Sequence, residues 1–158
     1  MSSPFPADRI QLDEAARKPT MAMYHLQNSI ELDETLANLV RLRASQVNGC
    51  AFCIDMHWKD ARAAGESEER LYSLDAWRES PLYDDRERAG LALTEAITLV
   101  AKGHIPDETW ENARASLSES ELANLVFEIT AINAWNRLMI TARVQPGLYR
   151  AGMLEAAA

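Results

Sequence analysis

Hydrophobic residues recur along this chain at spacings of three and four, which is the period of an amphipathic α-helix. One such run extends from Asp33 to Asn48, another from Asp84 to Gly103, and the longest covers residues 122–144. No stretch shows the two-residue alternation of β-branched residues that is typical of a strand. The pattern therefore predicts an all-α fold.

Residues that favour helix ends divide the chain into separate helices. Asn48 and Gly49 tolerate the left-handed backbone that ends or sharply bends a helix, so a new helix is expected to begin at Cys50. Two pairs have capping-box spacing, in which each residue satisfies a backbone group of the other. These pairs are Asp84 with Glu87 and Ser118 with Glu121, and each marks a predicted helix start. Other helices are predicted to start at Pro19, Asp33, Ser67 and Asp107. The predicted helix ends are Ile30, Gly65 and Gly103.

The length and composition of the chain fit one domain. With 158 residues, 47% of them hydrophobic, the chain can build a substantial core, and it contains no internal repeat or interdomain linker. We expect a single domain over residues 1–158, with an N-terminal arm at 1–18 and a flexible tail at 152–158. Hydrophobic residues nearly encircle the helix at 122–144, more than a lone bundle of this size covers, which favours a homo-oligomer.

The charge of the chain excludes several classes of partner. Twenty-four acidic and 16 basic residues give a net charge of -8, which leaves no basic stripe for nucleic acid or an anionic membrane surface. No apolar run is long enough to span a bilayer, and the first ten residues, MSSPFPADRI, lack the pattern of a signal peptide. We expect a cytoplasmic protein that binds neither nucleic acid nor membrane.

Both cysteines of the chain lie at one predicted helix start. Cys50 and Cys53 are three residues apart, and His57 follows four residues after the second cysteine. At about 100° per residue, all three share one helical face. A helix start favours a thiolate, and an imidazole titrates near neutral pH, where it can exchange the proton. One thiolate could then attack an oxidised substrate, and the other could resolve the product as a disulfide, with no metal or organic cofactor.

Two other interpretations of the cysteine pair stay open. The pair could bind Zn²⁺, but a closed zinc site needs four ligands, no second CxxC or HxxxH is present, and His25 and His104 are isolated. The cysteines could instead pack as buried apolar residues, which leaves His57 without an explanation. A non-catalytic or zinc-binding helical oligomer is therefore the alternative to a redox enzyme.

Two stretches of the chain resemble the carboxymuconolactone decarboxylase superfamily, in its alkylhydroperoxidase D-like (AhpD-like) branch: RASQVNGCAFCIDMHWKDAR at 43–62 and EITAINAWNR at 128–137. The resemblance covers the chain from residue 32 to about residue 143. It implies an AhpD-like helical bundle that forms trimers or hexamers, and a thiol-dependent peroxidase that reduces hydroperoxides and is re-reduced by a partner dithiol. It also implies that Cys53 is the attacking sulfur, Cys50 the resolving sulfur and His57 a member of a proton relay.

The chain departs from that branch at two positions. Its best-defined peroxidases have a glutamate twelve residues before the first cysteine, where this chain has Asn38, which cannot accept a proton. They also have a histidine between the cysteines, where this chain has Phe52. Glu34 lies one turn before Asn38, about 6 Å along the axis, and is the candidate replacement; otherwise His57 is the only nearby base.

The decarboxylase activity in the superfamily name is the less favoured function. Members with that role are not recognised by a CxxC pair, and the negative net charge of this chain does not attract an anionic substrate.

Other polar and sulfur-containing residues have structural interpretations. Asn136 and Arg137 lie in the most hydrophobic predicted helix, where we expect buried hydrogen-bonding residues or interface contacts. Four methionines can fill core gaps or line an apolar pocket over the thiols: Met21, Met23, Met56 and Met139. Three arginines lie near the motif, and one of them could support a thiolate: Arg41, Arg43 and Arg62.

Overall fold

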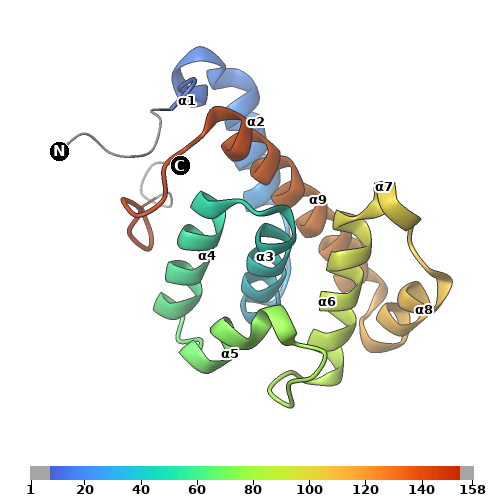
Figure 1. Ribbon diagram of the computed structural model, residues 1–158. Helices are drawn as coiled ribbons and strands as arrows, with labels where there is room; N and C mark the ends of the chain where they lie inside the picture. The colour runs from blue at the N-terminus through green and yellow to red at the C-terminus, as the bar shows by residue number, and fades with distance from the viewer. Residues whose placement is uncertain (1–7, 154–158) are drawn as a thin grey trace.

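The computed structural model describes residues 8–153, and within this range the chain forms helices and no strand, so the predicted all-α class is confirmed (Figure 1). Residues 1–7 of the predicted arm and 154–158 of the predicted tail lie outside the described residues. The elements are α1 (Leu12–Ala15), α2 (Arg17–Asn28), α3 (Glu34–Asn48), α4 (Ala51–Ala63), α5 (Glu68–Ser73), η1 (Leu74–Ala76), α6 (Asp85–Thr98), α7 (Val100–Gly103), α8 (Asp107–Ser116) and α9 (Glu119–Ala142).

The predicted starts of α3, α4, α5, α6 and α9 coincide with side-chain caps, whereas α2, which begins at Arg17, and α8, which begins at Asp107, have none. The Asp33 carboxylate accepts a hydrogen bond from the backbone N–H of Leu36 at 3.0 Å, which satisfies a free donor at the start of α3. Both predicted capping boxes are formed, at the starts of α6 and α9. The prediction missed α1, which lies inside the predicted N-terminal arm, and η1, because helices of three or four residues are too short to show a period. For the same reason it missed the break at Leu99, which divides the predicted run to Gly103 into α6 and α7.

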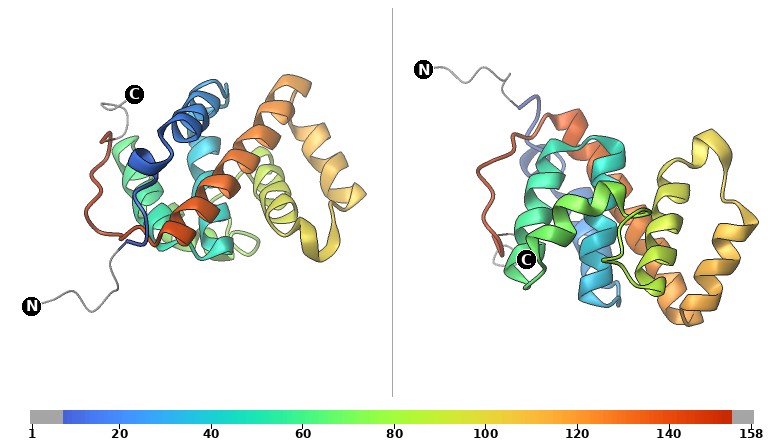
Figure 2. Two further views of the ribbon diagram at one scale, coloured as in Figure 1. Left: turned by 90° about the horizontal axis from the view of Figure 1, so that it is seen from above. Right: turned by 60° about the horizontal axis from the view of Figure 1, so that its bottom comes forward.

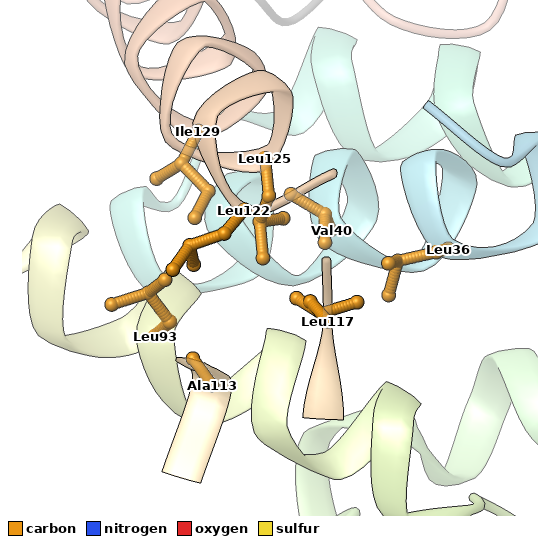
Figure 3. Packing of buried hydrophobic residues seen from close by; sticks show 8 residues of the cluster. All are labelled: Leu36, Val40, Leu93, Ala113, Leu117, Leu122, Leu125 and Ile129. Atoms are coloured by element: carbon orange, nitrogen blue, oxygen red, sulfur yellow. The ribbon is translucent and has the colours of Figure 1, made fainter. Parts of the chain in front are cut away.

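The core of the molecule is built around α3, which packs against α4, α6 and α9 (Figures 1 and 2). Figure 3 shows one cluster of buried side chains where α3, α6 and α9 meet α8 and the turn that follows it. This cluster consists of Leu36, Val40, Leu93, Ala113, Leu117, Leu122, Leu125 and Ile129. A second cluster, which includes Leu39, Leu42 and Ala61, fills the space between α3, α4 and α5. The helix that carries the cysteines, α4, is thus held on a well-packed support.

Buried amides connect α9 to the C-terminal end of α3. The Asn48 side-chain amide donates hydrogen bonds to the side-chain oxygens of Asn133, at 2.9 Å, and Asn136, at 2.8 Å. Asn136 in turn donates to the Ser45 hydroxyl at 3.0 Å and is fully buried, as predicted. Arg137 is exposed, which rules out the buried alternative and leaves the predicted interface contact as a prediction, and it donates a hydrogen bond to the Asn133 backbone. This network fixes the turn that precedes α4.

Gly49 forms the turn between α3 and α4 in the left-handed conformation, with φ 68° and ψ 33°. We expect Gly49→Ala to lower the free energy of unfolding by about 1 kcal/mol, because a Cβ strains this backbone. No atom lies within 4 Å of the added Cβ, so the cost is conformational. Gly49→Asn should cost less, because asparagine tolerates this conformation. Urea unfolding of both variants measures the difference, and equal losses would contradict this account.

None of the described helices is long and apolar enough to cross a bilayer.

Candidate active site

The two cysteines lie at the start of α4. Cys50 is the N-cap residue, and its Sγ accepts a hydrogen bond from the backbone N–H of Cys53 at 3.4 Å. Cys53 lies in the first turn, and the two residues form a disulfide with their Cα atoms 5.3 Å apart. Both are 1% exposed. In the reduced state the free N–H groups and the dipole of α4 favour a thiolate at this position.

The third predicted site residue, His57, lies one turn after Cys53 and is 8% exposed. Its Nε2 is buried and has no hydrogen-bond partner among residues 8–153. Burial lowers the pKa of His57 to about 3, and the charge of the nearby Arg41 lowers it further. The near-neutral titration expected for an ordinary histidine is therefore wrong for the disulfide form, in which the imidazole is neutral and its protonation is disfavoured.

The burial of His57 makes stability depend on pH. The pKa of His57 is about 3 in the folded protein, against 6.5 for a free histidine, so below pH 6.5 the unfolded chain binds a proton that the folded protein does not. Stability is therefore lost as the pH falls. Between pH 7 and pH 5, wild type should lose about 2 kcal/mol more unfolding free energy than His57→Gln. Urea unfolding at both pH values measures this difference. If wild type and His57→Gln lose the same free energy of unfolding between pH 7 and pH 5, His57 is not neutral and buried.

Cys53 and His57 line the same cavity, which has a volume of about 580 Å³. Cys50 is not part of this lining among the described residues, so Cys53 is the cysteine that borders the cavity. Much of the rest of the lining is aromatic or sulfur-containing, and consists of Tyr24, Phe52, Met56, Trp135 and Met139. The volume lies in the range of about 300–1000 Å³ that is typical of small-molecule sites. The arrangement therefore brings a dithiol, a neutral imidazole and room for an apolar molecule together.

Two segments from the ends of the described chain contribute to the cavity. Asp8 and residues 10–13 contribute to its lining, as do Val144 and Tyr149 in the segment after α9. This segment passes beside α4 (Figures 1 and 2). The Tyr149 hydroxyl donates to the Asp60 carboxylate of α4 at 2.7 Å. The backbone N–H of Gly147 donates to Asp55 at 3.0 Å. These two hydrogen bonds hold the segment after α9 against α4.

The expected replacement for the missing relay glutamate, Glu34, does not line this cavity. Glu34 and Asn38 line a different, polar cavity of about 620 Å³, whose lining contains neither Cys53 nor His57. This second cavity is slightly larger, but it lacks a thiol and an imidazole, so the cavity at Cys53 is the better candidate for an active site. Phe52, the other departure, lines the cavity at Cys53.

A buried carboxylate that the sequence analysis missed lies behind the cavity. Glu128 of α9 is fully buried, and its two oxygens accept hydrogen bonds from Arg41 Nε at 2.7 Å and Nη2 at 3.1 Å. Gln27 Nε2 also donates to both oxygens, at 2.9 and 3.0 Å. Arg41 and Gln27 both line the cavity. A lone glutamate inside the hydrophobic stretch at 122–144 is the sequence signal that could have revealed this pair, because a buried charge needs a partner.

Of the three arginines near the motif, Arg41 is the one at the site. Arg43 donates to Glu95 at 2.8 Å, and Arg62 lies 3.9 Å from Glu68. Within residues 8–153, no three side chains of histidine, cysteine, aspartate or glutamate are grouped so that they could hold a metal ion.

Comparisons with known proteins identify relatives of this chain in sequence and in fold. The sequence model of the Carboxymuconolactone decarboxylase family matches residues 19–96, which contain both cysteines and His57. The uncharacterized protein YdfG of Bacillus subtilis is 46% identical over 120 residues, which are 76% of this chain and 80% of YdfG.

Solved structures show the same fold. The crystal structure of ATU0492 from Agrobacterium tumefaciens matches with a TM-score of 0.87 and 38% identity, over 90% of this chain and 100% of that one. ATU0492 is described as a protein of unknown function and is proposed to be the antioxidant defence protein AhpD. The debrominase Bmp8 matches with a TM-score of 0.72 and 18% identity, over 84% of this chain and 74% of Bmp8, which is a likeness of fold alone.

Proposed function

This chain belongs to the carboxymuconolactone decarboxylase family, and from that premise we propose that it is a thiol-dependent peroxidase that reduces hydroperoxides with Cys50 and Cys53. The observation that carries the proposal is the position of Cys53, which lines an apolar cavity beside a neutral imidazole and is joined to a second cysteine at the start of α4. The likeness to ATU0492, itself proposed to be AhpD, also supports it.

The first step oxidises Cys53. His57 Nε2 accepts the thiol proton, and the resulting imidazolium and thiolate stabilise each other in the buried site. The thiolate attacks one oxygen of the hydroperoxide, the O–O bond breaks, and Cys53 becomes a sulfenic acid. The alkoxide leaves and takes the proton from the imidazolium to form an alcohol.

The second step forms the disulfide and the third restores the thiols. The Cys50 thiolate attacks the Cys53 sulfur, the S–O bond breaks, and the hydroxide takes up a proton and leaves as water. Cys50 suits this role because it already touches Cys53 at the N-cap and lies outside the cavity lining. A partner dithiol then reduces the disulfide by two exchanges and is itself oxidised to a disulfide.

The assembly and setting form part of the same proposal. Phe127 and Ile140 are exposed hydrophobic residues on α9, which supports a homo-oligomer, a trimer or a hexamer. The reaction needs no metal or organic cofactor, and the reducing cytoplasm suits a dithiol that must be reduced after each turnover.

A thiol count tests the proposal. Reduced protein has two thiols per chain, and one equivalent of cumene hydroperoxide should consume both and leave an intrachain disulfide. Titration with a chromogenic disulfide reagent gives the count, and intact mass shows the loss of two hydrogen atoms. Two thiols that survive the peroxide would overturn the proposal. A purified protein that contains metal, and whose melting temperature falls with a chelator, would favour the zinc-binding alternative.

A further inference from the structure

The cavity beside Cys53 has a single cationic side chain among its described lining residues, and that charge is already compensated. Arg41 is 26% exposed, and it contacts the Glu128 carboxylate with two nitrogens. Because Glu128 is fully buried, solvent does not screen its negative charge, and its electrostatic attraction to Arg41 is strong. The pair as a whole therefore presents little net charge to the cavity.

The remaining charged groups of the cavity are acidic. Asp8, Asp13 and Asp60 also belong to the lining. One carboxylate oxygen of Asp8 is buried and has no hydrogen-bond partner within residues 8–153. An anionic ligand that entered would lose its hydration and meet more negative than positive charge. The charge of the lining therefore disfavours the entry of carboxylates.

The uncharged part of the lining suits an aromatic group. The rings of Tyr24 and Trp135 pack against each other with centroids 4.9 Å apart, and Phe52 adds a third ring. Met56 and Met139 supply thioethers, which make favourable contacts with the edges of aromatic rings. Such a surface gives an aromatic ligand contacts beyond simple burial of area.

We propose that the Arg41–Glu128 pair sets the charge selectivity of this site, so that it takes uncharged hydroperoxides with an aromatic group and rejects those that carry a carboxylate. This inference rests on the proposed peroxidase function. Glu128 acts as a specificity-determining residue without touching the substrate, because it holds the positive charge of Arg41 away from it.

The test compares two hydroperoxides that differ by one charge. Reduced protein is mixed with cumene hydroperoxide or with its ring-carboxylated analogue, and the rate of disulfide formation is measured in a single turnover. The reaction of each compound with a free small-molecule thiol supplies the intrinsic reactivity. After this correction, wild type should prefer the uncharged compound by about tenfold or more.

The Glu128→Gln variant should reverse part of this preference. Glutamine keeps the shape of the side chain but leaves the charge of Arg41 uncompensated, so the ratio of the two rates should shift about tenfold towards the carboxylated compound. Gln27→Lys adds a second cation beside Glu128 and should shift the ratio in the same direction if Glu128→Gln does not fold. The exposed Glu111→Gln change on α8 is the matched control and should leave the ratio at the wild-type value.

The outcomes separate this inference from the function on which it rests. If neither hydroperoxide oxidises the thiols, the proposed peroxidase function fails. If both oxidise wild type at equal corrected rates, or if the ratio stays unchanged in Glu128→Gln and Gln27→Lys, the peroxidase function stands and the proposed selectivity is wrong.

Discussion

Cys53→Ser is expected to lower the rate of hydroperoxide reduction by a factor of about a thousand or more. Cys50→Ser should reduce one hydroperoxide molecule per chain and then stop. Serine in place of Cys53 removes the sulfur of the cysteine that lines the cavity, and an alcohol is not oxidised by a hydroperoxide. Cys50→Ser keeps that sulfur but removes the resolving thiol. The two changes are chemically identical and lie three residues apart, so each is the matched control for the other.

The measurement separates the two roles of the cysteines. After one equivalent of hydroperoxide, Cys50→Ser should hold a sulfenic acid at Cys53, which a β-diketone probe traps and intact mass detects. Cys53→Ser should stay unmodified under the same conditions. A sulfenic acid in Cys53→Ser and none in Cys50→Ser would mean that the roles are reversed. Melting temperatures close to that of reduced wild type would show that both variants are folded.

The helix boundaries were predictable from sequence because caps are local. Asp33 satisfies a backbone group three residues away, and the Ser118 capping box likewise closes within one turn. The close placement of Cys50 and Cys53 was predictable for the same reason, since helix geometry alone brings them to one end of α4. These features need no knowledge of how the helices pack.

The electrostatics of the site were not predictable in this way. The protonation state of His57 depends on its burial and on Arg41, which lies on a different helix. The pair of Arg41 and Glu128 joins residues 87 positions apart, so it appears only once α3 and α9 are packed. Sequence spacing suggested Glu34 as the acidic residue near the thiols, but the fold places Glu34 at another cavity. The protonation state of His57, the pairing of Arg41 with Glu128 and the position of Glu34 all depend on how distant helices pack, which the spacing of residues along the sequence does not reveal.

Arg41→Met is expected to lower the free energy of unfolding by about 3–5 kcal/mol, because it leaves the charge of Glu128 buried without a cation. Gln27 still donates to the carboxylate, but a neutral amide offsets only part of the cost of its desolvation. Urea unfolding at pH 7 and one fixed protein concentration measures the loss, since any self-association would otherwise change apparent stability.

Two further variants identify burial as the cause of that loss. Arg114→Met breaks an exposed pair with Glu111 on α8 and should change stability by no more than about 0.5 kcal/mol. The double variant Arg41→Met with Glu128→Leu removes both charges, and it should recover most of the stability, because an apolar pair of similar size carries no desolvation cost. If Arg41→Met costs no more than Arg114→Met, the Glu128 carboxylate reaches solvent in solution. Glu128 would then not neutralise the charge of Arg41, and the proposed charge selectivity of the cavity would lose its basis.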